Sequence, residues 1–250
     1  CAKLDVRVAV SQAAREFVDS YFPAAYDIVP NGIQLEQFHV DADPLPQFMD
    51  GRRNILFVGR FNEPRKGFRY LVRAMPQIRG QFPEARLIVV GQGNAARYER
   101  FLEQHGITDV VFAGFVDSET LPRYYASADV FVAPSTGRES FGLILLEGMA
   151  SGVPIVSTTI PGYSAVIRNG IDGVLVEPKD AQALAMGIVR VLADADLRQR
   201  LVASGLQHVK QFSWAVVAEE LLTLYQRAIE QHQAGPSRRS WPVEIAGRRG

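Results

Sequence analysis

The sequence contains little that would indicate disulfide bonds, metal sites or membrane spans. Its 250 residues include one cysteine, Cys1, which excludes a disulfide bond within the chain and is typical of a reducing compartment. The longest apolar runs are far shorter than the roughly twenty residues that cross a bilayer. Four histidines lack the spacing of metal ligands, so we expect no metal cofactor; they are His39, His105, His208 and His232.

An excess of either charge is also absent. The 27 Lys and Arg residues balance the 27 Asp and Glu residues, which argues against a surface that coats nucleic acid. The first ten residues show no signal-peptide pattern, so we expect a cytoplasmic protein. The chain begins without methionine and enters a strand-like run at once, from Val6 to Val10. We therefore expect it to be part of a longer polypeptide.

Short apolar runs alternate with segments of helical spacing through the middle of the chain. The runs are Ile55 to Val58, Leu87 to Val90, Val110 to Ala113, Val130 to Ala133, Ile155 to Ser157 and Val174 to Val176. Runs of this kind are typical of strands buried on both faces. The alternation predicts an α/β fold, a Rossmann-like, doubly wound and mostly parallel sheet. Ligands of such sheets bind at the C-terminal ends of the strands.

The regions around this pattern predict the domain organisation. Residues 1–40 contain a strand-like run, a helix capped by Ser11 and a turn at Asn31-Gly32, and we interpret them as the remnant of a neighbouring N-terminal domain. Residues 41–53 read as a linker, and residues 54–232 as the ligand-binding domain. Its closing helices are expected near Ala181 to Ala193, Asp196 to His208 and Ser213 to Gln231. The Gly-, Pro- and Arg-rich residues 233–250 predict a disordered tail.

Two cations follow the first strand of the sheet. The segment VGRFNEPRKGF places Arg60 and Lys66 on one loop, and a helix is expected to open at Gly67. At a ligand-binding edge this pair could neutralise a diphosphate, because Arg binds phosphate oxygens bidentately and Lys acts as a mobile point charge. A solvated basic loop is the alternative interpretation, and for the pair alone it is the more common one.

Two glutamates lie on either side of a helix start after the fourth strand. In APSTGRESFGLILLEGMASG, Glu139 precedes a helix that we expect to open at Ser140, and Glu147 lies two turns into it. The first four amides, from Ser140 to Leu143, would lack helical partners and could bind an anion, with Gly142 permitting close approach. Glu139 could accept hydrogen bonds from sugar hydroxyls, and Glu147 from a ribose diol. In the alternative, structural interpretation, Glu139 complements the helix dipole and Glu147 lies on a solvated face of the helix.

Three weaker signals complete the analysis. The segment GQGN, Gly91 to Asn94, lacks the full glycine spacing of a dinucleotide fingerprint and reads as a tight turn. After the third strand, Val116 and Asp117 offer backbone groups to a base, with Ser118 as a helix cap, although a plain capped turn explains them as well. The aromatic residues Phe212 and Trp214 favour packing.

The ordered set of segments VGR, EPRKG, GFV, ESFGLILLE and FSW resembles the C-terminal, donor-binding domain of family 4 glycosyltransferases, the C-terminal half of the two-domain GT-B fold. The resemblance covers roughly residues 1–232, and NEPRKG and ESFGLILLE are most similar to phosphatidylinositol mannosyltransferases. It implies catalytic roles for Arg60, Lys66 and Glu139. It implies donor binding by Gly59, Arg60, Lys66, Val116, Asp117, Glu139, Ser140, Phe141, Gly142, Leu143 and Glu147.

This resemblance implies a retaining transfer of a hexose from a nucleotide sugar, without a metal or an enzymic nucleophile. Mannose from GDP-mannose is the first expectation, with a lipid or glycan as acceptor and a UDP-sugar as the alternative donor. The acceptor site would belong to the missing N-terminal domain, so this chain would bind donor without turnover. That domain could also place the enzyme at the inner face of the membrane. No nucleic-acid partner is expected.

Two readings of other classes remain. A nucleotide-binding module without catalysis would use the same donor site, although the intact set of cations and glutamates argues against it. A nicotinamide-dependent dehydrogenase would need a glycine fingerprint after the first strand, where VGRFNEPRKG stands instead.

Overall fold

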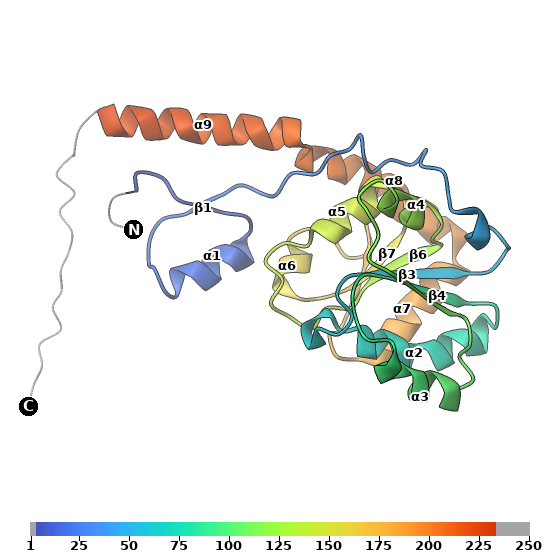
Figure 1. The fold of residues 1–250 in the computed structure, drawn as a ribbon. Coiled ribbons are helices and arrows are strands. Elements are labelled where there is room, and N and C mark those ends of the chain that lie inside the picture. Colours follow the sequence, from blue (N-terminus) through green and yellow to red (C-terminus); the bar gives the residue numbers. More distant parts are fainter. Residues whose placement is uncertain (1–3, 234–250) are drawn as a thin grey trace, which may run out of the picture.

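A six-stranded parallel sheet forms the centre of the computed structural model, which describes residues 4–233 (Figure 1). Its strands are β3 (Asn54–Val58), β4 (Arg86–Val90), β5 (Val110–Gly114), β6 (Val130–Ala133), β7 (Ile155–Thr158) and β8 (Val174–Val176). They lie in the order β5-β4-β3-β6-β7-β8, and every neighbouring pair is parallel. The predicted α/β doubly wound sheet is confirmed, with each strand within one residue of its predicted bounds.

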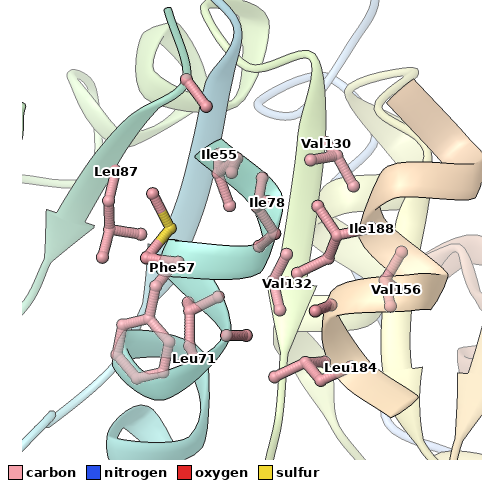
Figure 2. Close-up of a cluster of buried hydrophobic side chains, with 14 of the residues drawn as sticks. Ile55, Phe57, Leu71, Ile78, Leu87, Val130, Val132, Val156, Leu184 and Ile188 are labelled. Carbon is pink, nitrogen blue, oxygen red and sulfur yellow. The ribbon is translucent and has the colours of Figure 1, made fainter. Parts of the chain in front are cut away.

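Helices cover both faces of the sheet. One face packs against α2 (Phe68–Gln81), α3 (Ala96–Gln104) and α7 (Ala181–Ala193), and the other against α4 (Leu121–Ala126), α5 (Leu143–Ala150) and α6 (Pro161–Ser164). Figure 2 shows side chains of α2 and α7 meeting those of the central strands; among them are Leu71, Ile78, Leu184, Ile188, Ile55 and Val132. Because both faces of the strands are buried, their sequences are continuously apolar rather than alternating.

The last helices return to the N-terminal segment. Helix α8 (Ala195–His208) and a 3-10 turn (Val209–Phe212) lead into α9 (Trp214–Gln233). Arg227 on α9 forms an ion pair with Asp27 in the N-terminal segment. All three helices predicted after the sheet are confirmed to within two residues. Of the tail predicted at residues 233–250, Gln233 belongs to α9, and the other residues lie outside those that the structure describes.

The N-terminal segment forms a small unit of its own. Strands β1 (Val8–Ala9) and β2 (Asp27–Ile28) make a two-stranded parallel sheet separate from the six-stranded one. Between them, α1 (Gln12–Asp19) begins after Ser11, whose side chain accepts the Ala14 N–H at 3.0 Å. The predicted N-cap is therefore confirmed, because Ser at this position satisfies an amide that the helix leaves free.

The turn predicted at Asn31-Gly32 is wrong. Neither residue is assigned to a turn, and Ile33 forms a parallel bridge with Ser213. Gly32 is required by packing, because a Cβ there would lie 2.4 Å from the Trp214 ring. An Asn-Gly pair permits a turn, but here the glycine allows close contact between two segments that are distant in sequence.

The stretch predicted as a linker packs against the sheet domain. Leu45 and Phe48 are buried, and Leu45 N donates to Ser127 Oγ at 2.8 Å. Arg86, at the start of β4, forms an ion pair with Asp50 at 2.8 Å. The hydrogen bond from Arg86 holds the pKa of the Asp50 carboxyl below its ordinary value. The domain boundaries themselves stay predictions.

Candidate functional site

The predicted site lies where the strand order reverses. Strands β3 and β6 are neighbours, and the chain continues from them in opposite directions, through β4 and β5 on one side and β7 and β8 on the other. Doubly wound sheets bind ligands in the crevice at the C-terminal ends of such strands. Two loops meet at this crevice, residues 59–67 after β3 and residues 134–142 after β6.

These two loops are in direct backbone contact. Gly67 caps α2 with φ +70, and a Cβ there would lie 1.7 Å from Pro134 O. Only glycine meets both requirements, the left-handed backbone and the close approach. Thr136 N also donates to Arg65 O at 2.7 Å. The contact fixes the positions of side chains that come from segments about 70 residues apart.

Glu139 forms two ion pairs at this contact. Its Oε1 lies 2.8 Å from Lys66 Nζ and 2.7 Å from Arg65 Nη1. The side chains of Glu139 and Lys66 are only 14% and 16% exposed. Water screens such charges less than it screens charges on the open surface. The structure thus brings together two of the three residues predicted to act in catalysis.

Arg60, the third of those residues, connects to the same cluster through Glu63. Arg60 Nε lies 2.7 Å from Glu63 Oε1, and Glu63 Oε2 lies 2.8 Å from Arg65 Nη2. The Arg60 side chain is 65% exposed, so it has room to turn toward a ligand. Sequence reasoning missed Arg65 as a member of this cluster, although its place beside Lys66 in EPRKG was the available signal.

Two hydroxyl groups, those of Ser135 and Tyr163, form a hydrogen-bond chain to Glu139. Ser135 Oγ lies 3.3 Å from Glu139 Oε1 and 2.9 Å from Tyr163 Oη. Burial raises the pKa of Tyr163 far above its ordinary value, which keeps the phenol neutral and hydrogen-bonding. Gly162 lets α6 approach, because a Cβ there would lie 1.9 Å from Glu139 O. These contacts hold the Glu139 loop in one position.

The prediction that a helix opens at Ser140 is wrong. Helix α5 begins at Leu143, after Gly142 with φ +107. Ser140 instead remains in the loop, where its carbonyl accepts a hydrogen bond from Ser11 Oγ, and the Phe141 side chain is buried. Within residues 4–233, the amides from Ser140 to Leu143 still donate no hydrogen bond. They are free because of the loop, not because of a helix start at Ser140.

Glu147, on α5, is paired with a buried tyrosine. Its Oε2 accepts a hydrogen bond from Tyr125 Oη at 2.8 Å. Burial raises the pKa of the Glu147 carboxyl above its ordinary value, and the hydrogen bond from Tyr125 opposes this shift. Burial raises the pKa of Tyr125 as well. The sequence indicated that a glutamate in this apolar helix needs a partner, but it did not identify Tyr125.

A pocket of about 300 Å³ lies at the ends of β3, β4 and β5. It is lined by Val58, Gly59, Arg60, Val90, Gly91, Gln92, Phe115, Val116 and Leu121. Gly59 and Val116 therefore share a cavity with Arg60, as a common ligand would require. Asp117 is used differently, because its Oδ1 accepts the Thr120 N–H at 2.7 Å at the start of α4. The N-cap residue of α4 is Thr120, so the predicted helix cap at Ser118 is wrong.

The weaker aromatic and glycine signals belong to packing. The rings of Phe141 and Phe212 meet edge to face with centroids 5.8 Å apart, and Trp214 lies against Gly32. A Cβ at Gly91 would lie 2.1 Å from Gly59 O, so this glycine allows the loops after β3 and β4 to approach each other.

Neither a metal-ligand cluster nor a membrane-spanning helix is found in the part of the chain that the structure describes. Among residues 4–233, no three His, Cys, Asp or Glu side chains are grouped as metal ligands. None of the described helices combines the length and the apolar character needed to span a bilayer.

The sequence of this chain is similar to the sequences of known glycosyltransferases. Residues 52–194 match the family model described as "Glycosyl transferases group 1". The chain is 36% identical over 230 residues to a phosphatidyl-myo-inositol mannosyltransferase of Mycobacterium tuberculosis, covering 90% of this chain and 60% of that protein. It is 30% identical over 243 residues to a D-inositol 3-phosphate glycosyltransferase of Salinispora tropica, covering 88% of this chain and 50% of that protein.

Solved structures share the fold. A sucrose-phosphate synthase from Thermosynechococcus elongatus superposes with a TM-score of 0.78 at 29% identity, over 89% of this chain and 58% of that one. Anabaena HepE in complex with UDP and glucose gives a TM-score of 0.76 at 22% identity, over 89% of this chain and 63% of that one. The chain thus spans about 60% of the length of the mannosyltransferases that it matches.

Proposed function

The chain belongs to the glycosyl transferases group 1 family, and on that premise we propose that it supplies the donor site of a retaining hexosyltransferase. The six-stranded sheet is the C-terminal half of the GT-B architecture, as the solved relatives indicate. The acceptor side belongs to the part of the relatives that this chain does not span. The donor is a nucleotide sugar, bound across the crevice between the loops after β3 and β6.

The observation that carries this proposal is the ion-pair cluster beside the nucleotide-sized pocket. Three cations, Arg60, Arg65 and Lys66, converge with two glutamates at the strand edge. A dianionic diphosphate on Arg60 and Lys66 would replace the carboxylates that now neutralise them. The pocket around Gly59 and Val116 would then receive the base, next to the same arginine.

Catalysis on this site works by stabilising charge. When the sugar leaves, negative charge grows on the departing diphosphate, and preorganised cations in a water-poor crevice lower the energy of that state. Arg60 and Lys66 perform this role in place of a metal ion. The free amides from Ser140 to Leu143 add hydrogen-bond donors next to them. Glu139, released from Lys66, would accept hydrogen bonds from the hydroxyls of the transferred sugar.

Retention of the anomeric configuration follows from attack on the face from which the diphosphate departs. Glu139, which we propose to contact the sugar, is already engaged by two cations and a hydroxyl. A carboxylate held in this way is a weak nucleophile, since its charge is shared among hydrogen-bond donors. It suits positioning of the sugar better than covalent catalysis.

Glu147 binds the ribose in this proposal. Its carboxylate lies within a largely apolar helix and has one hydrogen-bond donor, Tyr125. A ribose diol would supply two more, which would compensate for the burial of the charge. Tyr125 therefore acts as a positioning residue, because it fixes the carboxylate without contacting the sugar.

GDP-mannose is the proposed donor and a UDP-sugar is the alternative. Relatives from several mycobacteria and from Propionibacterium freudenreichii are named phosphatidyl-myo-inositol mannosyltransferases, which supports mannose and a lipid acceptor at a membrane surface. A UDP-bound relative at 22% identity supports the fold alone, so it does not favour UDP here.

Calorimetric titration of this chain with GDP, UDP and GDP-mannose, without added metal, tests the proposal. Arg60→Ala and Glu147→Ala remove a diphosphate and a ribose contact, and Arg73→Ala, an exposed cation on α2 outside the crevice, is the matched control. We expect both site variants to bind GDP at least about tenfold more weakly and the control to bind normally. Preference for UDP would change the donor and keep the enzyme class. Unaltered affinity in both site variants would refute the site.

A further inference from the structure

Arg65 also lines a second pocket, which Glu139 does not line. It has a volume of about 460 Å³ and is formed by the turn after β3, the first turn of α2, the loop after β6 and the turn after β8. Its lining consists of Glu63, Pro64, Arg65, Arg69, Thr136, Gly137, Arg138 and Lys179. None of the residues predicted to bind the donor lines it, so the two pockets are distinct.

Positive charge dominates this pocket. Four of its eight lining residues are cations and one, Glu63, is an anion, whereas the whole chain has no net charge. Glu63 is already neutralised by Arg60 and Arg65. Within the described residues, Arg138 and Lys179 have neither an acidic partner nor a hydrogen-bond partner. Arg65 is balanced by Glu63 and Glu139, whereas the charges of Arg138 and Lys179 are not balanced by the protein.

The backbone holds these two cations in an unusual conformation. Arg138 has φ +60 and Lys179 has φ +66, and within residues 4–233 they are the only residues other than glycine with positive φ. The left-handed region costs free energy for a residue with a side chain, and such costs concentrate at ligand-binding positions. Next to Arg138, a Cβ at Gly137 would meet nothing within 4 Å. The backbone there is open to a small ligand.

We propose that this pocket binds a phosphate group, as a phosphomonoester or a phosphodiester, at a site separate from the donor diphosphate. Arginine and lysine from four different segments surround a cavity large enough for phosphate and the group attached to it. Guanidinium groups bind phosphate oxygens in pairs, and lysine adds a compact charge. The proposal concerns binding alone, so it does not depend on which sugar is transferred or on transfer itself.

Arg65 connects the phosphate pocket to the ion-pair cluster that contains Glu139. It lines the pocket and also holds Glu139 at 2.7 Å. A phosphate that attracts Arg65 weakens its hold on Glu139, so occupancy of one site changes the other. A phosphate-bearing acceptor would in this way be bound next to the donor. A free phosphate and a lipid headgroup share the chemistry that the pocket recognises.

The test follows amide resonances of the isotope-labelled chain during titration with inorganic phosphate and with glycerol 3-phosphate. Vesicles of phosphatidylcholine with and without phosphatidylinositol form a parallel arm that tests a lipid source. The double variant Arg138→Asn/Lys179→Asn removes both unpaired charges, and asparagine tolerates the left-handed backbone. The control Arg73→Gln/Arg100→Gln removes two exposed charges elsewhere. Arg138→Asn alone serves if the double variant melts early.

We expect saturable shifts at Gly137 and Lys179 that weaken about tenfold or more in the double variant and persist in the control. Binding of phosphatidylinositol vesicles without binding of the soluble phosphates would assign the source to a lipid headgroup. Equal affinity in the double variant and the control would overturn the proposal. Loss of GDP binding together with phosphate binding would overturn it too, because the pocket would then be part of the donor site.

Discussion

The sheet domain and the N-terminal segment with α9 bury apolar side chains to very different extents. In the sheet domain, both faces of the strands are covered, and residues such as Leu71 and Phe131 are fully buried. In the other region, Phe17 on α1 and Tyr225 on α9 are 69% and 64% exposed. Further exposed apolar side chains there are Leu4, Val8, Tyr21, Phe22, Ile28, Leu222 and Ile229.

This difference in apolar burial indicates which parts of the chain can fold independently. A helix or a two-stranded sheet is marginal in water unless it buries an apolar face, and α1, β1 and β2 bury little. The sheet domain has the two covered faces that a stable α/β fold requires. The prediction that residues 1–40 belong to a neighbouring domain stays a prediction, and the exposed apolar residues are those that such a domain would have to cover.

The largest effect is expected from a cavity in the sheet domain. Leu71→Ala on α2 should lower the free energy of unfolding by about 2–5 kcal/mol, because it removes buried methyl groups and leaves a void. Phe17→Ala on α1 should change it by less than about 0.5 kcal/mol, although a larger side chain is lost. Denaturant unfolding followed by circular dichroism measures both. Similar losses in the two variants would mean that α1 packs against a core after all.

The next effect concerns the joint between the two regions. Gly32→Ala places a methyl group against the Trp214 ring, which should cost about 1–3 kcal/mol locally. We expect faster hydrogen exchange in α9 and around Ile33, with unchanged exchange in the central strands. Gly80→Ala, at a position where a Cβ meets nothing within 4 Å, is the control. If exchange quickened throughout the sheet domain, the two regions would form one cooperative unit.

The sheet domain was predictable from sequence because its signals are local. Each buried strand is a continuous apolar run, and the loops after β3, β4 and β6 begin with Gly59, Gly91 and Pro134. The Asn31-Gly32 pair misled for the opposite reason, since the need for glycine comes from Trp214, far away in the sequence. The predicted start of α5 at Ser140 was also wrong. The Ser140 carbonyl accepts a hydrogen bond from Ser11 Oγ, a contact that comes from a segment far away in the sequence.

The site was predictable to the same degree. Arg60, Lys66 and Glu139 could be placed at one strand edge because parallel topology brings the loop after each strand to the same side. Arg65 was missed although it stands beside Lys66, and Tyr125 could not be assigned because its role depends on its contact with Glu147 across the fold. The roles in binding and catalysis stay predictions.

A smaller effect is expected where the sheet domain buries a charge. The pKa of Glu147 lies above its ordinary value of 4.5, so the folded state binds its proton more tightly than the unfolded state does. Stability from this group is complete below pH 4.5 and is lost as the pH rises through the raised pKa. Glu147→Gln keeps an acceptor for Tyr125 and removes the charge. Its unfolding free energy should exceed that of the parent by about 1 kcal/mol at neutral pH.

The gain should vanish below pH 4.5, and unfolding curves across pH measure it. Nucleotide affinity should fall in the same variant, since a neutral amide accepts ribose hydroxyls less strongly than a carboxylate. Glu220→Gln on α9, an exposed position, should show neither change. A stability advantage that did not depend on pH would mean that packing rather than charge is responsible.

The smallest effect on stability is expected on the exposed face of α9. This face carries three exposed apolar side chains at helical spacing, Leu222, Tyr225 and Ile229. Changing all three to serine should alter the unfolding free energy of the sheet domain by less than about 0.5 kcal/mol. Helix α9 itself should fray, because serine has a lower helix propensity than leucine. Removing this contiguous apolar surface should also reduce self-association, which sedimentation velocity measures over a range of concentrations. The polar triple variant Thr223→Ser/Gln226→Ser/Glu230→Ser on the same helix controls for loss of helix propensity. A sheet domain destabilised only by the apolar triple variant would show that α9 contributes to its core and would remove the contrast between the two regions.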